Sequence, residues 1–393
     1  MIVRQLYRKH HEIVLCAKTH LDKHTPGSDN APGLTQENSM KKGLFALLLM
    51  VVALTAGCPT SNEQSVLINA SYDPTRELYK VFNEAFCKHY KNKTGEDVRI
   101  EVTHAGSSAQ ARSVIEGLEA DVVTLALAYD IDNIVQKTGW LPEDWQKRLP
   151  HNSTPYSSTV VFLVRKDNPR NIKGWDDLIK PGIEIVVAHP KTSGVARWAY
   201  LAGWGYALQE ALGGDLSKLH DPNAAAEVTA AQAKAREFIT ALYKNVKILP
   251  PGARSASQAF VQHGNGDVLL DWENQAEMTI NESKVGGGQY EIVVPSVSIL
   301  AEPPVAVIDA NVEKHGTRKA AEAYLEFLYS KEGQEIVAKH HYRPRDEEIL
   351  KKYTEKGSFV SVKMFTIDDV FGGWQKAQKE HFEDGGIFDQ IMQ

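Results

Sequence analysis

Three places in the sequence could bind an anion without using a charged side chain. At each one a β-rich run is followed by small or polar residues that open a helix: Ser71–Pro74 (SYDP), Gly106–Gln110 (GSSAQ) and Thr192–Ala196 (TSGVA). The first N–H groups of a helix have no partner within it and lie at the positive end of its dipole. Several helix starts facing one cleft would therefore hold an oxyanion. Taken singly, each junction is more typical of ordinary capping, and spacing alone does not show convergence.

Capping patterns indicate where two of these helices begin. Asp73 followed by Pro74 predicts a side-chain N-cap with proline at the first helical position. Ser107 with Gln110 three residues later has the spacing of a capping box. As an N-cap, the Asp73 carboxylate should point at its own helix start.

The elements that must position these junctions alternate between short β-rich runs and amphipathic helices. This order predicts an α/β fold with a largely parallel sheet. The expected strands are Val66–Ala70, Val98–Thr103, Val122–Leu127, Thr159–Arg165, Ile183–Ala188, Val268–Trp272 and Ile292–Val294.

The 393 residues are enough for two domains, but no long linker divides the sequence. The chain is therefore expected to cross between domains through strands, first at Tyr156–Arg165 and again within Tyr290–Ile308. The last third is expected to be helical, including Ala320–Tyr329, Lys331–Lys339 and Ile367–Phe382. The expected limits are 66–155 for the first part of domain I, 156–289 for domain II, and 290–393 for the return to domain I with the C-terminal helices.

The first 65 residues contain a secretory pattern that starts at Met40. Lys41 and Lys42 precede an apolar run that ends in Leu54–Cys58 (LTAGC), which resembles a bacterial lipobox with Cys58 as the lipidated residue. A buried core helix is the alternative. We therefore interpret 1–39 as a leader or mis-called start, 40–57 as a lipoprotein signal peptide and 58–65 as a tether.

Composition excludes several other classes. The net charge of −6 is unfavourable for nucleic-acid binding. Cys16, Cys58 and Cys87 lie far apart, so neither a disulfide framework nor a zinc cluster is expected. The chain has no G-x-S-x-G, P-loop, H-E-x-x-H or dinucleotide motif. We expect no catalytic residue, metal or cofactor.

Six stretches resemble the periplasmic sulfate-binding proteins of bacterial ABC importers, and the similarity runs from about Val66 to Gln390. They are SYDPTREL at 71–78, EADVVTLALAYD at 119–130, STVVFLVRK at 158–166, ARWAYLAGWGYAL at 196–208, HYRPRD at 341–346 and FTIDDVFGGW at 365–374. Thiosulfate-binding proteins share much of this pattern.

The resemblance implies a two-domain periplasmic-binding-protein fold of type II, with a mixed sheet flanked by helices in each domain and the ligand in the interdomain cleft. It also implies a ligand held chiefly by backbone N–H groups. By position these belong to Asp73, Ser193, Gly194, Val195, Ala253 and Trp272, and Ser107 is expected to contact the ligand through its hydroxyl. Val195 departs from the pattern, because the family commonly has glycine there.

The resemblance further implies a periplasmic protein that delivers sulfate to the permease subunits of an ABC transporter. We expect it to be a monomer, and the lipobox predicts that lipid on Cys58 tethers it to the membrane. Thiosulfate, molybdate or tungstate, and phosphate remain alternative ligands, and an enzyme acting on a sulfate ester is the rival from another class. His104, Arg197 and Arg254 adjoin these positions. They would add positive potential or, alternatively, serve as a structural histidine and as partners of carboxylates.

Overall fold

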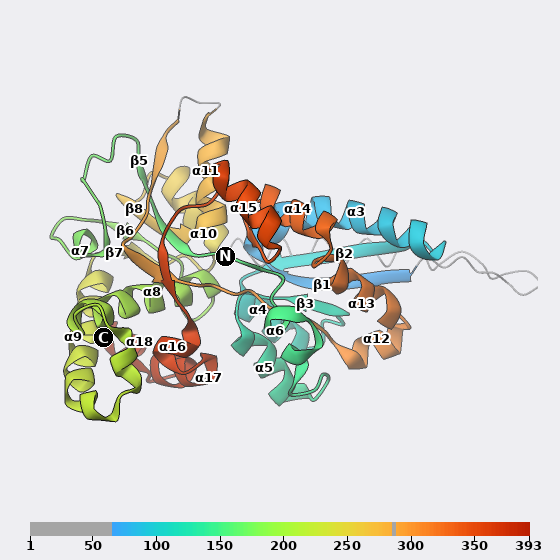
Figure 1. The fold of residues 1–393 in the computed structure, drawn as a ribbon, viewed down its shortest axis with the longest axis horizontal. Helices are drawn as coiled ribbons and strands as arrows, with labels where there is room; N and C mark the ends of the chain where they lie inside the picture. Colours follow the sequence, from blue (N-terminus) through green and yellow to red (C-terminus); the bar gives the residue numbers. More distant parts are fainter. Residues whose placement is uncertain (1–64, 285–287) are drawn as a thin grey trace, which may run out of the picture. The chain divides into compact units, whose positions relative to one another are not determined.

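The computed structural model describes residues 65–284 and 288–393, which contain two large sheets flanked by helices and two sheets of two strands each (Figure 1). The leader, the signal peptide, Cys58 and nearly all of the tether lie outside the described residues. We call the four-stranded sheet with its helices the first lobe and the five-stranded sheet with its helices the second lobe. The expected α/β class, with mixed sheets flanked by helices, is confirmed.

The first lobe is built on a sheet with strand order β11-β3-β1-β2, in which only β11 is antiparallel to its neighbour. Its elements are β1 Ser65–Tyr72, α3 Arg76–Thr94, β2 Val98–Ala105, α4 Ser107–Ile115, β3 Val122–Thr124, α5 Ala128–Thr138, β11 Val305–Val307, α12 Asp309–His315, α13 Arg318–Phe327 and α14 Lys331–Lys339.

Apolar spacing explains how α3 covers this sheet. Leu78, Phe82 and Phe86 recur every four residues and are fully buried, so they form one stripe on α3. The ring of Tyr324 from α13 packs edge-on against Phe82 and Phe86, with centroids 5.2 and 5.1 Å away. The opposite face is covered by α4 and α5, which bury Val114 and Ile131. Parallel strands covered on both sides place their carboxyl ends, and the helix starts that follow them, at one edge.

The second lobe has strand order β7-β6-β8-β5-β9, with β5 antiparallel to both of its neighbours. Its elements are β5 Val160–Arg165, α7 Trp175–Leu178, β6 Ile185–Val186, α8 Gly194–Ala211, α9 Ala225–Lys244, β7 Val246–Ile248, α10 Ala253–Val261, β8 Val268–Trp272, α11 Glu273–Lys284 and β9 Tyr290–Val293. Helix α8 is buried on nearly every side, which explains why its sequence is apolar without a polar stripe.

The chain passes between the lobes at paired strands. Ser158 and Ala301 exchange backbone hydrogen bonds of 2.9 and 3.0 Å, so the outgoing and returning segments lie side by side. A third connection runs through β12 Arg343–Pro344, which pairs with β4 Tyr156–Ser157. Arg343 reaches the buried carboxylate of Glu273 at the end of β8 through two hydrogen bonds of 2.7 Å.

The structure departs from the expected domain limits in two places. Strand β9 pairs with β5 in the second lobe, although residues from 290 onward were assigned to the first. The helices α17 Trp374–Ala377 and α18 Ile387–Ile391 also pack on α8, where the ring of Trp374 lies 4.6 Å from that of Trp198. In α16 Ile367–Phe371, the carbonyl of Asp369 lies 2.8 Å from the ring of His220, before α9. The chain therefore returns to the second lobe after α15 Glu347–Glu355 and β13 Lys363–Phe365, which pairs with β10 Val297–Ile299.

Candidate functional site

The predicted helix starts converge on one place between the lobes. Gly106, which precedes α4 of the first lobe, is so close to the second lobe that a Cβ there would lie 2.6 Å from the carbonyl oxygen of Thr192. Gly194, the first residue of α8, is equally close to the first lobe: a Cβ there would overlap that of Ala126 and lie 3.6 Å from the Cβ of Ser107. The N-termini of α4 and α8 therefore face each other across the lobes.

Two more junctions complete the site. Asp73 opens the 3-10 turn before α3, and its Oδ2 lies 3.2 Å from where a Cβ on Gly252 would be. Gly252 precedes α10, whose first residue is Ala253. Trp272 at the end of β8 packs against the ring of Tyr72 with centroids 6.1 Å apart. The structure thus brings all seven expected ligand residues to one interlobe region.

The two capping predictions are wrong, and the difference matters for the site. Tyr72, not Asp73, precedes the first helical turn, and no side chain caps it. The Asp73 carboxylate instead lies 3.6 Å from Arg76, and burial raises its pKa. Gly106 rather than Ser107 is the N-cap of α4, and the amide of Gln110 donates to the carbonyl of Ser71.

Some of the expected backbone donors already have acceptors. The N–H of Ser193 donates to the carbonyl of His189 at 2.9 Å, and that of Trp272 donates to its neighbour Asp271 at 2.9 Å. Gly194, Val195 and Ala253 stand at the first or second position of their helices, where an N–H has no carbonyl within the helix to bind.

The hydroxyl of Ser107 also has partners within the protein. It donates to Asp130 at 2.5 Å and accepts from the N–H of Ala126 at 2.9 Å. Its single hydrogen is thus used, and only its backbone N–H remains to donate to a ligand.

Directly behind Ser107 lies a buried ion pair: Arg197 pairs with a carboxylate, as the alternative for it predicts, but its partner Asp130 was not expected from the sequence. Asp130 accepts from the hydroxyls of Ser107 and Ser108 and lies 3.8 Å from Arg197. Burial raises the pKa of Asp130 and lowers that of Arg197, while each charge opposes the shift of the other. Asp130 is 23 residues from Ser107, so no local pattern indicated the contact.

The other two basic neighbours have structural roles. Arg254 pairs with Glu77 at 3.2 Å across the lobes, as the carboxylate alternative predicts. His104 is half-buried with no hydrogen bond at its buried Nδ1, and burial lowers its pKa to about 4. It is therefore neutral at pH 7 and adds no charge to the site.

Asp271 links two elements of the site beneath its surface. One carboxylate oxygen accepts from the hydroxyl of Ser257 on α10 at 2.7 Å, and the other accepts from the N–H of Trp272. Complete burial raises the pKa of Asp271 to about 7, although both hydrogen bonds oppose the shift. The carboxyl group fixes α10 relative to the end of β8.

Between residues 65 and 393, apart from 285–287, no cluster of His, Cys, Asp and Glu could hold a metal ion. No helix in the same part of the chain is long and apolar enough to cross a membrane.

Comparisons with known proteins give the family. Residues 75–343 match the bacterial extracellular solute-binding proteins. The chain is 56% identical over 325 residues to the sulfate-binding protein of Escherichia coli, covering 83% of this chain and 92% of that one. It is 47% identical over 350 residues to the thiosulfate-binding protein of Pseudomonas aeruginosa, covering 89% and 98%.

Among solved structures, the sulfate-binding protein SubI from Mycobacterium tuberculosis is similar over 81% of this chain and all of its own, with a TM-score of 0.68 and 27% identity. The expected type II solute-binding fold is thereby confirmed. The chain belongs to the bacterial extracellular solute-binding protein family.

Proposed function

We propose that this protein binds sulfate between its lobes and delivers it to an ABC-type importer. The observation that carries the proposal is the convergence of the starts of α3, α4, α8 and α10, seen in the close approaches at Gly106, Gly194 and Gly252. A dianion at this point would receive neutral N–H donors from both lobes. The similarity to sulfate-binding proteins over most of the chain supports the same ligand.

The proposed donors follow from which groups are still available. They are the backbone N–H groups of Asp73, Ser107, Gly194, Val195 and Ala253. At Ser193 and Trp272 the backbone N–H is used within the protein, so we assign their contacts to the side chains: the Ser193 hydroxyl and the Trp272 indole N–H. These two side chains are 3% and 1% exposed, so either contact would be shielded from water.

Val195 does not remove a donor from this set. It is 2% exposed and occupies the second position of α8, so its N–H still faces outward from the helix start. Its side chain belongs to the buried core, which leaves the anion facing its backbone.

Thiosulfate is the second candidate, because the chain is also similar to a thiosulfate-binding protein. Calorimetric titration of the purified protein with sulfate, thiosulfate, molybdate, tungstate and phosphate tests the proposal. Saturable one-to-one binding of sulfate, tighter than of molybdate, is expected. Turnover of a sulfate ester would support an enzyme instead.

We further propose a monomeric periplasmic protein held at the membrane by lipid on Cys58. The support is the sequence from Lys41 to Cys58 and the extracellular family. Mass spectrometry of the native protein should find lipidated Cys58 as the first residue, and Cys58→Ala should release the protein from the membrane. Residues 1–39 in the mature protein would contradict this proposal.

A further inference from the structure

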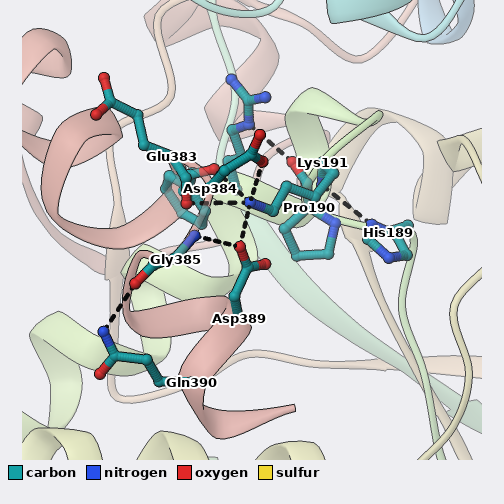
Figure 2. Close-up of polar contacts among 10 residues, drawn as sticks. His189, Pro190, Lys191, Glu383, Asp384, Gly385, Asp389 and Gln390 are labelled. Carbon is teal, nitrogen blue, oxygen red and sulfur yellow. Dashed lines mark hydrogen bonds and ion pairs between the residues drawn. The ribbon is translucent and has the colours of Figure 1, made fainter. Parts of the chain in front are cut away.

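The loop that leads into α8 is tied to a distant part of the chain through Lys191. Its ammonium group donates to the carbonyls of Phe382 at 2.8 Å and Glu383 at 3.1 Å, and to Asp389 Oδ2 at 2.9 Å. Figure 2 shows the ammonium group of Lys191 between the carboxylates of Asp384 and Asp389, with Glu383 beside it. The Asp384 contact is longer, at 3.4 Å, and that carboxylate is fully exposed.

Asp389, which accepts a hydrogen bond from the Lys191 ammonium group, is itself held in place by the segment around it. Asp389 Oδ2 also accepts from the N–H of Gly385 at 2.8 Å, and the amide of Gln390 donates to the Gly385 carbonyl. The guanidinium group of Arg236 on α9 donates to the side-chain oxygen of Gln390 at 2.8 Å. The segment that receives Lys191 is thus fixed to the second lobe, the lobe to which α8 belongs.

The loop between Lys191 and α8 has little freedom of its own. The carbonyl of His189 accepts from the N–H groups of Thr192 and Ser193. The imidazole Nδ1 of His189 accepts from the backbone N–H of Lys191 at 3.1 Å. The His189 N–H donates to Pro250, just before α10, and its ring lies edge-on to Phe388 at 5.6 Å. A displacement of Lys191 would therefore reach both helix starts.

We propose that Lys191, held by Asp389, is a positioning residue that fixes the loop before α8, so that Ser193, Gly194 and Val195 face the anion. This rests on the proposed function. Lys191 is 24% exposed in its side chain and Asp389 29%, so the pair is partly shielded from solvent. A preorganised loop loses less conformational entropy on binding, which raises affinity without any contact to the ligand.

A long-range charge effect predicts a different result. If Lys191 acted only through its positive charge, removing the carboxylate in Asp389→Asn would leave a more positive site and tighten sulfate binding. If Lys191 acts by positioning, the same variant removes the nearer of the two carboxylates that bind the ammonium group and weakens sulfate binding. The sign of the change therefore separates the two explanations.

The experiment titrates sulfate into the parent, Lys191→Met, Asp389→Asn and the double variant, with Asp384→Asn as the matched control. We expect binding roughly three- to thirtyfold weaker for both single variants, the range for residues that act without touching ligand. The double variant should be no weaker than the worse single one, because the two side chains act as a pair. Asp384→Asn should bind as the parent does.

Hydrogen exchange of the ligand-free proteins separates this inference from the proposed function. Lys191→Met and Asp389→Asn should speed exchange of the amides at 191–195 but not in β5, and Asp384→Asn should change neither. If the parent binds no sulfate, the proposed function fails while the exchange data still decide the loop. If exchange at 191–195 is unchanged, or Asp389→Asn binds sulfate as tightly as the parent or more so, the positioning role is wrong.

Discussion

At the scale of single residues, Ser107 and Ser193 both stand at a predicted helix start, but the hydrogen-bond partners of their hydroxyls differ. The Ser193 hydroxyl is proposed to face the ligand, whereas that of Ser107 binds Asp130 and Ala126. We expect Ser193→Ala to weaken sulfate binding by roughly ten- to hundredfold, as for about 1–3 kcal/mol of lost hydrogen bonding in a dry site.

Ser107→Ala should act in the opposite way. It removes a partner of the buried Asp130 carboxylate, so it should lower the melting temperature more than Ser193→Ala does while keeping the backbone contact to sulfate. Calorimetric titration and thermal unfolding of the two variants measure both quantities. Equal affinities for Ser193→Ala and the parent would remove the hydroxyl from the proposed site.

The donor groups that line the proposed site also determine which oxyanion it prefers. Sulfate carries no proton at neutral pH, whereas phosphate carries at least one that needs an acceptor. In a site lined by donors, an unsatisfied phosphate O–H costs about 1–3 kcal/mol before repulsion, and we expect phosphate to bind at least about a hundredfold more weakly. Competition against labelled sulfate at pH 5 and pH 8 measures this ratio.

Asp73→Asn is the control for the predicted preference for sulfate over phosphate. The Asp73 carboxylate is not the N-cap that the sequence predicts, and it lies at the interlobe edge beside Gly252. If this carboxylate accepted the phosphate proton, Asp73→Asn would change the ratio of the two affinities. We expect the ratio to stay unchanged. Equal competition by phosphate at either pH would mean that an acceptor lines the site.

The Asp271 carboxyl group should give the protein an unusual pH dependence. Its folded-state pKa of about 7 lies above the unfolded value of about 4, so its contribution to stability is present below pH 4 and is lost as pH rises through 7. The free energy of unfolding should fall by at most about 1.4 kcal/mol per pH unit in that window. Denaturant titrations of Asp271→Asn should show a flatter profile between about pH 4 and pH 7.

The matched control for Asp271 is Asp97→Asn, because Asp97 is half-exposed and pairs with Lys91 at the surface. That variant should keep the parental dependence on pH. If Asp271→Asn and the parent have parallel profiles, the buried carboxyl group does not titrate in this range.

At the scale of elements, the sequence predicts those that carry a strong local pattern. Strand β8 was expected with the bounds it has, and α3 follows its apolar spacing. Strands β4 and β12 have two residues each, too few for any periodicity to show. The Ser107 cap failed because its hydroxyl binds Asp130, 23 residues away, and such tertiary contacts override local preference. The Asp73 cap failed because the helical turn begins one residue earlier than expected, and the Asp73 carboxylate lies near Arg76 instead.

Glycine at the start of α8 is required by the neighbouring lobe rather than by its own backbone conformation. A Cβ at Gly194 would overlap that of Ala126, which belongs to the loop after β3 in the first lobe. Gly194→Ala should therefore hinder closing of the lobes at a cost of about 1–3 kcal/mol, the usual range for overpacking, and weaken sulfate binding roughly five- to hundredfold. Its melting temperature without ligand should stay close to that of the parent.

Gly174→Ala is the control for this substitution, because Gly174 also precedes a helix of the second lobe but has open space around its Cβ position. It should bind sulfate as the parent does. Calorimetry of the two variants side by side tests whether the interlobe contact, and not the loss of a glycine at a helix start, weakens binding.

At the scale of the whole molecule, the site exists only where the lobes meet, which no local pattern in the sequence could show. Ser71–Pro74 and Thr192–Ala196 are more than a hundred residues apart, and each pattern alone is typical of ordinary capping. The similarity to a known family supplied the convergence in advance. The similarity did not show which N–H and O–H groups already donate to acceptors within the protein. That depends on the turn at His189 and on the buried Asp130.

The contacts between lobes predict a conformational change on binding. Trp198 of α8 donates its indole N–H to the carbonyl of Ala126 at 3.0 Å, and Arg254 meets Glu77 at 3.2 Å, so both bonds join one lobe to the other. Only the closed form brings both sets of proposed donors to the anion, so sulfate should shift an open population to the closed one. Small-angle scattering should show a smaller radius of gyration with sulfate for the parent and a weaker change for Gly194→Ala at the same sulfate concentration.

A radius that sulfate leaves unchanged in the parent would mean either that the lobes are closed before the ligand arrives or that they do not move. Trp198 fluorescence separates these two cases, because burial against Ala126 is complete from the start only in a closed ligand-free protein.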